Sequence, residues 1–262
     1  MTKEDKKNLI KATHAGGKIL KKYFGKTLNL VEKSMIADFK TEADTESEKT
    51  ILRILKKEFK NYNIHSEENG KINKSSKYTI VIDPLDGTNN FVLGIPNFSI
   101  TIAVLFEGEA IAGVIHQPIL KQTYFAEKGK GAFLNNKKIK VNNNKDPKAL
   151  TIAYSCGYKT SHTRIANIIR SLVVSKFYKR VTFNWSPAYD HCLLASGKIE
   201  ALITDAGTEI YDFGAGKLIA KEAGAKIYTL DGKKDTDFLN DAFIIGNSEK
   251  VIKNVLKRIP NR

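Results

Sequence analysis

The chain has 262 residues and a formal net charge of +15, with 42% hydrophobic and 27% charged residues. This composition is typical of a soluble globular protein with one large domain or two modest ones. No apolar stretch reaches the ~18 residues of a membrane span, and the N-terminus lacks the apolar core of a signal peptide. We therefore expect a cytoplasmic protein that has no membrane partner.

The cysteines and lysines narrow the possible partners. Cys156 and Cys192 do not have the spacing of a zinc site or a disulfide framework. Lysines are spread along the whole chain, without the aromatic-interleaved basic block that favours nucleic-acid binding. We interpret the charge as a solvated surface that draws in anionic substrates, and this pattern does not favour a nucleic-acid partner.

In the first half of the chain, apolar spacing predicts helices over residues 4–24 and 43–60. Strands should dominate from residue 78 to about residue 141. They include an apolar run over 78–82, a hairpin formed by 98–106 and 109–116 across Glu107-Gly108, and a strand over 122–126.

The polar stretch 142–147 is the most linker-like part of the sequence, so we predict domains over 1–146 and 147–262. After it, strands and helices alternate, which favours a layered α/β half behind an α+β half. The predicted strands are 150–154, 199–203, 226–228 and 242–245, and the predicted helices are 164–174, 187–195, 212–223 and 249–258.

Two carboxylates follow the apolar run 78–82, in the stretch IDPLDGTNNF. Asp83 would be costly to bury without a cation or hydrogen bonds, and Pro84 turns the chain so that Asp86 can return to the same side. A close carboxylate pair with the Leu85 carbonyl suits Mg²⁺. Gly87 and Thr88 would open a short helix, 88–93, whose N–H groups can receive a phosphate. The alternative is a turn in which both aspartates only cap the backbone.

Other acidic residues could complete such a site, although each has a structural alternative. Glu67 and Glu68 lie in a polar loop just before the strand, where paired glutamates are usually solvated. Asp212 opens a glycine-rich helix and Asp44 lies near another helix start, so both could be plain caps.

Together, these stretches resemble the inositol monophosphatase family, within the lithium-sensitive, Mg²⁺-dependent phosphatases that include fructose-1,6-bisphosphatase. The resemblance covers most of residues 30–230. It implies an αβαβα layered sandwich of the sugar-phosphatase fold. The matching segments are 83–91 (D-P-[IL]-D-G-T-x-N-F), 211–216 with 222–224 (W-D-x-A-A-G…E-A-G), 67–68 (G-E-E), 41–44 (V-T-x-x-D) and 129–133 (G-x-G-A-F).

The resemblance also implies a role for each matching residue. Two or three Mg²⁺ ions would be bound by Glu67, Asp83, the Leu85 carbonyl, Asp86 and Asp212. Glu67, Thr88 and Asp44 would be catalytic, the last two by orienting or deprotonating the attacking water. The phosphate would meet Lys33, Asp86, Gly87 and Thr88.

The chain departs from the family pattern mainly around the expected substrate pocket. Tyr211 replaces a tryptophan, and Trp185 replaces a small residue in a segment that resembles G-S-A-A-x-D. Asp190 could reach a substrate or brace a helix. Asp205 lies where inositol-specific members place an acid, so an acid there is compatible with a polyol.

The residues and the resemblance together predict a phosphomonoesterase that hydrolyses a small polyol phosphate such as inositol 1-phosphate, and the resemblance implies a homodimer. Within phosphatases, fructose 1,6-bisphosphate, histidinol phosphate and 3′,5′-bisphosphonucleotides are alternative substrates. A non-catalytic regulator that binds RNA or protein is the alternative of a different class.

Overall fold

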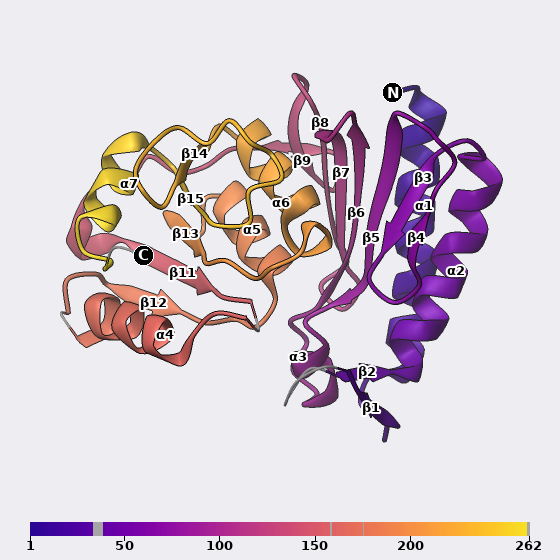
Figure 1. The fold of residues 1–262 in the computed structure, drawn as a ribbon, viewed down its shortest axis with the longest axis horizontal. Coiled ribbons are helices and arrows are strands. Elements are labelled where there is room, and N and C mark those ends of the chain that lie inside the picture. The colour runs from indigo at the N-terminus through magenta and orange to yellow at the C-terminus, as the bar shows by residue number, and fades with distance from the viewer. Residues whose placement is uncertain (34–38, 158, 175, 261–262) are drawn as a thin grey trace.

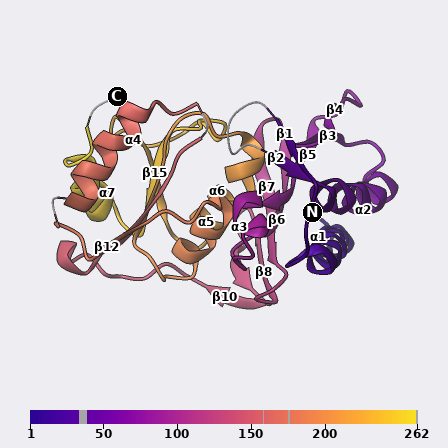
Figure 2. The ribbon, with the colours of Figure 1, turned by 90° about the horizontal axis from the view of Figure 1, so that it is seen from below.

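The chain forms five layers of helices and sheets, and the computed structural model describes residues 1–33, 39–157, 159–174 and 176–260 (Figures 1 and 2). Helices α1 (Lys3–Tyr23) and α2 (Glu42–Glu58) cover the outer face of an eight-stranded sheet. Helices α5 (Pro187–Ala195) and α6 (Ile210–Glu222) lie between that sheet and a five-stranded one, whose far face packs on α4 (His162–Ile169) and α7 (Glu249–Leu256). The predicted αβαβα sandwich is confirmed.

The eight-stranded sheet has the order β10-β9-β8-β7-β6-β5-β3-β4. Neighbouring strands are antiparallel except for β3 and β5, which run parallel. The parallel pair matters for function because it brings the ends of two strands to the same edge of the sheet. The strands are β3 (Asn63–Ser66), β4 (Gly70–Ile72), β5 (Tyr78–Asp86), β6 (Ser99–Phe106), β7 (Glu109–Gln117), β8 (Gln122–Glu127), β9 (Gly131–Leu134) and β10 (Lys137–Ile139).

Strand β5 extends beyond the point where the sequence analysis ended it. The apolar run was expected to stop at Ile82, but pairing with β6 continues to Asp86, with a register shift between Asp83 and Asp86. Pro84 explains the shift because it has no N–H to donate to the ladder. The turn around Pro84 is therefore a bulge inside the strand, after which α3 (Thr88–Val92) begins.

The first two helices begin at capping boxes. Thr2 and Asp5 cap α1, and Thr41 and Asp44 cap α2, each by reciprocal bonds between side chain and backbone. The apolar faces of both helices pack on the large sheet around Leu9. The predictions of helices over 4–24 and 43–60 are confirmed to within two residues at each end.

The five-stranded sheet has the order β12-β11-β13-β15-β14. Strands β12 and β13 flank β11 in parallel, whereas β15 is antiparallel to both of its neighbours. The four predicted strands lie within two residues of the observed ends, and β12 was not predicted. The bounds are β11 (Thr151–Ser155), β12 (Arg180–Thr182), β13 (Ala201–Thr204), β14 (Lys226–Thr229) and β15 (Phe243–Gly246).

The other unpredicted elements are short. Strands β1 (Leu30–Glu32) and β2 (Phe39–Thr41) pair with each other beside α3, and β3 and β4 form the edge of the large sheet. The helix predicted over 164–174 is α-helical only to Ile169 and continues as a π-helix from Arg170 to Val174.

The two sheets are separated by residues 140–150, which contain a single 3₁₀ turn, η1 (Pro147–Ala149). The predicted boundary after residue 146 falls in this segment and stays a prediction of domain organisation. Among the described helices, none combines the length and apolar character that crossing a bilayer requires.

Candidate active site

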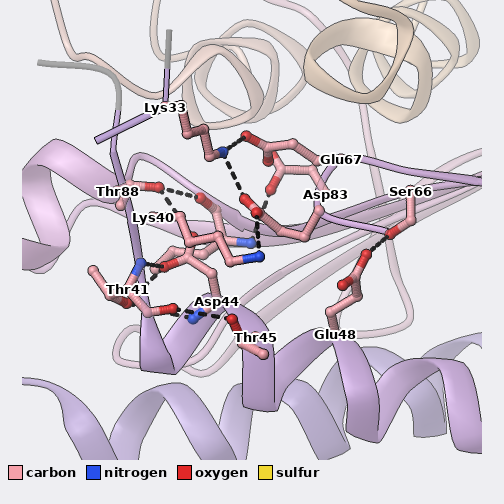
Figure 3. Close-up of polar contacts among 12 residues, drawn as sticks. Lys33, Lys40, Thr41, Asp44, Thr45, Glu48, Ser66, Glu67, Asp83 and Thr88 are labelled. Carbon is pink, nitrogen blue, oxygen red and sulfur yellow. Dashed lines mark hydrogen bonds and ion pairs between the residues drawn. The ribbon is translucent and has the colours of Figure 1, made fainter. Parts of the chain in front are cut away.

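The N-terminus of α2 delivers Asp44 to a buried position. One carboxylate oxygen, Oδ2, accepts from the backbone N–H and the hydroxyl of Thr41, at 2.8 and 2.6 Å. The other, Oδ1, faces the Thr88 hydroxyl at 3.3 Å, and the same hydroxyl lies 3.0 Å from the Leu85 carbonyl (Figure 3). Burial raises the pKa of Asp44 to about 7. Asp44 is therefore a helix cap with one oxygen still directed at Thr88.

The bulge in β5 places two aspartates in the protein interior. Asp83 is 2% exposed, and its Oδ1 accepts from the Leu85 N–H at 2.8 Å, as in an Asx turn. Asp86 is 3% exposed and accepts from the Ser99 hydroxyl at 2.9 Å. Burial raises the pKa of Asp86 to about 6, although its hydrogen bonds oppose that shift. Both aspartates therefore accept from backbone or hydroxyl groups while lying in the protein interior.

A loop between β3 and β4 brings Glu67 against Asp83. The Glu67 N–H donates to the Ile82 carbonyl at 3.1 Å, which fastens the loop to β5. Burial raises the pKa of Glu67, and burial together with the charge of Glu67 raises that of Asp83 well above its usual range. Two carboxylates in contact are unstable as a doubly ionised pair unless a proton or a cation lies beside them.

Two lysines supply part of that positive charge. Lys33 Nζ lies 2.7 Å from Glu67 Oε1 and 2.6 Å from Glu68 Oε1, and Lys40 Nζ lies 3.1 Å from Glu68 Oε2 (Figure 3). Burial disfavours the Lys33 ammonium, but the two glutamates outweigh burial and raise its pKa. Lys33, predicted near the phosphate, therefore contacts a predicted metal ligand directly.

Asp212 reaches the same region from the first turn of α6. It is the third residue of that helix, not its first, and its Oδ2 accepts from the Glu209 N–H at 2.7 Å in a capping box. Burial, with the charge of Glu67 as the next contribution, raises the pKa of Asp212 well above its usual range. Asp212 thus joins the acidic group formed by β5 and the β3–β4 loop.

The acidic group fits a divalent cation in kind and charge. Glu67, Asp83, Asp86 and Asp212 all have raised pKa values because they are buried, and neighbouring carboxylates add to each rise. Hard carboxylate oxygens are the donors that Mg²⁺ prefers. Within the described ranges, however, no three His, Cys, Asp or Glu side chains are already arranged around a point where an ion could sit. The residues thus supply the donor chemistry, but not a closed ligand set.

Gly87 lies where the two halves of the chain meet. Its φ is +88°, and a Cβ there would lie 2.9 Å from the Asn97 carbonyl oxygen and 3.1 Å from Ser186 Cβ. Ser186, at the start of α5, donates its hydroxyl to Asp86. Only glycine fits this left-handed, crowded position without strain, and the predicted phosphate-binding turn is therefore held against the second half of the chain.

The segment before α5 carries Trp185 and positions Asp190. Trp185 is 62% exposed and has a φ of +51°, a conformation that costs a bulky residue energy. The Asn184 backbone carbonyl accepts from the Asn90 side chain at 2.7 Å. The Asn184 side-chain amide donates to Asp190, which is 1% exposed. Burial raises the pKa of Asp190 to about 8. Asp190 thus braces the Trp185 segment from inside.

Asp205 is also occupied by bonds within the protein. It pairs with Arg164 at 2.7 Å, accepts from the Tyr154 hydroxyl at 3.2 Å, and is 2% exposed. It lines a cavity of about 780 Å³ beside the first turn of α6, the helix that carries Asp212. Other residues that line the cavity are Lys159, Ser161, Glu209 and Asp241.

With this geometry established, comparisons with known proteins identify the family. The profile of the "Inositol monophosphatase family" matches residues 2–261. The chain belongs to the inositol monophosphatase family. It is 30% identical to "Nus factor SuhB" of Pasteurella multocida, over 85% of this chain and 82% of that protein.

Other relatives agree on the family but carry different names. "Fructose-1,6-bisphosphatase/inositol-1-monophosphatase" of Thermotoga maritima is 32% identical, over 95% of this chain and 96% of that protein. The crystal structure of extragenic suppressor protein suhB from Bartonella henselae superposes with a TM-score of 0.89 at 28% identity, covering 97% of this chain and 99% of that one. Membership in the inositol monophosphatase family therefore does not fix one activity.

Several residues that shape this candidate site were not predicted as site residues. Ser99 and Ser186 donate to Asp86, and Lys40 pairs with Glu68. Which hydroxyl donates to a carboxylate depends on the tertiary fold, so the sequence gives little indication of it. Of the two serines, Ser186 could have been noticed because it lies inside the segment that departs from the family pattern.

Proposed function

We propose that the protein is a Mg²⁺-dependent phosphomonoesterase that hydrolyses a small polyol phosphate such as inositol 1-phosphate. The observation that carries the proposal is the group of raised-pKa carboxylates around the bulge of β5, next to the Gly87–Thr88 turn. An isolated capped turn would not need Glu67 and Asp212 brought in from other elements.

The ions would be held by Glu67, Asp83, the Leu85 carbonyl, Asp86 and Asp212. When bound, Mg²⁺ lowers the pKa of a coordinated water and neutralises charge on the phosphoryl oxygens. Binding, orientation and proton transfer would be carried out by the chain's own residues.

Thr88 and Asp44 would handle the proton of the attacking water. The Thr88 hydroxyl has one proton, which it can donate in a hydrogen bond to Asp44 Oδ1 or to the Leu85 carbonyl. While this hydrogen bond points to ionised Asp44, the hydroxyl oxygen can accept a hydrogen bond from a water. As the water attacks, its proton would pass to the Thr88 oxygen and the Thr88 proton to Asp44, whose pKa of about 7 suits a proton acceptor. Gly87 and Thr88 would bind the phosphate through backbone N–H groups, and Lys33 would add positive charge.

The alcohol half of the substrate would lie between Trp185 and the cavity beside Asp205. The cavity volume falls in the range of small-ligand sites, and an exposed indole can pack against a ring. Asp190 and Asp205 would shape this region through Asn184 and Arg164, because both carboxylates are already bonded to these side chains.

The test is turnover by the purified chain, with and without Mg²⁺, of inositol 1-phosphate, fructose 1,6-bisphosphate, histidinol phosphate and adenosine 3′,5′-bisphosphate. We expect Mg²⁺-dependent phosphate release, fastest for the polyol phosphate. The Asp86→Asn variant should lose at least about 100-fold in kcat, since a metal ligand would be neutralised. Near wild-type activity in that variant would refute the metal assignment, and poor turnover of the polyol phosphate would refute the substrate.

A second candidate is a regulator that binds RNA or protein without catalysis. The net charge of +15 favours it, as does the similarity to a relative named "Nus factor SuhB". This candidate predicts RNA binding that survives Asp83→Asn and falls steeply with salt, together with no Mg²⁺-dependent turnover. A homodimer stays an expectation that light scattering can check.

A further inference from the structure

A row of three buried polar residues on α2 contacts three separate parts of the acidic site. Asp44, Ser47 and Glu48 lie on one face of the helix and are 0%, 0% and 1% exposed. Asp44 faces Thr88, and the Ser47 hydroxyl donates to the Pro84 carbonyl in the bulge of β5 at 2.9 Å. Glu48 has no role in the proposed chemistry, yet it carries a buried carboxylate.

The Glu48 carboxylate accepts hydrogen bonds from the end of β3 and from the loop between β3 and β4. Its Oε1 accepts from the Ser66 hydroxyl (Figure 3). The same oxygen accepts from the Asn69 N–H at 3.0 Å, while Oε2 accepts from the Asn69 side-chain amide. Ser66 and Asn69 are the residues directly before and after Glu67 and Glu68. Glu48 therefore binds both ends of the turn that carries the acidic pair.

On its other side, the turn is held by ion pairs to the glutamate side chains and by a backbone hydrogen bond to β5. Lys33 and Lys40 pair with the Glu67 and Glu68 carboxylates, and the Glu67 N–H donates to the Ile82 carbonyl. Strand pairing holds the ends of the turn, because Ser66 pairs with Ile82 in β5 and with Gly70 in β4. Glu48 adds a contact to the Asn69 N–H inside the turn, so the turn can stay in place when another cation replaces Lys33 at Glu67.

We propose that Glu48 is a positioning residue that orients Glu67 for binding a divalent cation. This inference rests on the proposed function. Groups that orient metal ligands commonly affect metal affinity by 10- to 100-fold. The chemistry requires a carboxylate: three donors converge on two oxygens, and glutamine would turn one of these acceptors into an NH₂ that faces a donor.

The test compares Glu48→Gln with Glu46→Gln in the full-length chain. Glu46 lies two residues earlier on α2, and its side chain is 45% exposed, so the same chemical change is made at the surface. Mg²⁺ affinity is measured by calorimetry, and kcat and the half-saturating Mg²⁺ concentration are measured at a temperature where both variants are folded. We expect Glu48→Gln to weaken Mg²⁺ binding by 10- to 100-fold with kcat at saturating Mg²⁺ largely kept, and Glu46→Gln to match the wild type.

Mg²⁺ affinity within two-fold of the wild type in Glu48→Gln would overturn the proposal. If that variant does not fold, Asn69→Ala removes the side-chain amide contact to Glu48 Oε2 from the other side and must show the same split between Mg²⁺ affinity and kcat. Amide exchange of residues 66–69 adds a readout that needs no metal: it should speed up in Glu48→Gln but not in Glu46→Gln. A wild-type chain that binds no Mg²⁺ would refute the proposed function, whereas unchanged exchange in Glu48→Gln would refute this inference alone.

Discussion

The Ser186 hydroxyl donates to the Asp86 carboxylate, which joins the start of α5 to the bulge of β5 across one hundred residues of sequence. The Ala188 N–H adds a second bond to the same carboxylate, at 3.3 Å. Asp86 is therefore held by both halves of the chain, and the Gly87 turn beside it is packed against Ser186. The geometry of the candidate site depends on how the two sheets and their shared helix layer fit together.

Gly87→Ala should be more harmful than Gly94→Ala. Both glycines have positive φ, +88° and +73°, but a Cβ at residue 87 meets the Asn97 carbonyl oxygen at 2.9 Å, whereas nothing lies within 4 Å at residue 94. The backbone conformation costs about 1–2 kcal/mol in each case, and overpacking adds about 1–3 kcal/mol at residue 87 only. Urea unfolding measures both variants, and equal losses would contradict the crowding seen around Gly87.

Arg164→Met should destabilise the second half of the chain by roughly 2–4 kcal/mol. Among the described residues, the variant leaves the buried Asp205 carboxylate with the Tyr154 hydroxyl and the Ala206 N–H as donors. Removing one partner of a buried ion pair leaves the cost of burying the other charge uncompensated. The double variant Arg164→Met with Asp205→Asn removes that charge and should recover part of the loss. Thermal melting of the two variants decides the point; no recovery in the double variant would mean that Arg164 acts through packing instead.

The sequence predicts the layers better than the site geometry. Long periodic segments such as α1 and α2 were predicted to within two residues because a buried face repeats over several turns. Strands β1 and β12, of three residues each, have no room for a period and were not predicted. The bulge at Pro84 was interpreted as a turn, since a missing N–H signals an interruption but does not say whether pairing resumes.

In the candidate site, too, some residues could be predicted from the sequence and others could not. Asp44, Glu67, Asp83 and Asp212 lie on elements whose ends are visible in the sequence, and the fold brings them close. The partners that occupy Asp190 and Asp205, namely Asn184 and Arg164, could not be predicted, because these contacts depend on side-chain packing between segments. Glu48 offered one signal, as it lies four residues after Asp44 on the same face of α2.

Trp185 should tolerate replacement by asparagine better than by valine. With φ at +51°, residue 185 adopts a left-handed conformation that asparagine accepts and a β-branched residue does not. We expect Trp185→Asn to be about 1–2 kcal/mol more stable than Trp185→Val in urea unfolding. Equal stability of the two variants would mean that the loop relaxes to a negative φ.

Asp190 should make the protein less stable as the pH rises from about 4 to about 8. Burial raises the pKa of Asp190 to about 8, whereas the unfolded carboxyl titrates near 3.9. Between these values the folded state binds more protons than the unfolded state, so the free energy of unfolding falls with increasing pH. Below about pH 4 both states are protonated and the effect vanishes.

Asp190→Asn should remove this pH dependence while keeping an oxygen for the Asn184 amide. Relative to the wild type, we expect the variant to gain roughly 2–4 kcal/mol at pH 8 over its difference at pH 4.5, measured by urea unfolding in EDTA. Asp146→Asn, at an exposed carboxylate in the segment between the sheets, is the control and should show no such gain. Parallel pH curves for Asp190→Asn and the wild type would show that Asp190 ionises normally, which would require water or a cation to reach it beside Asn184.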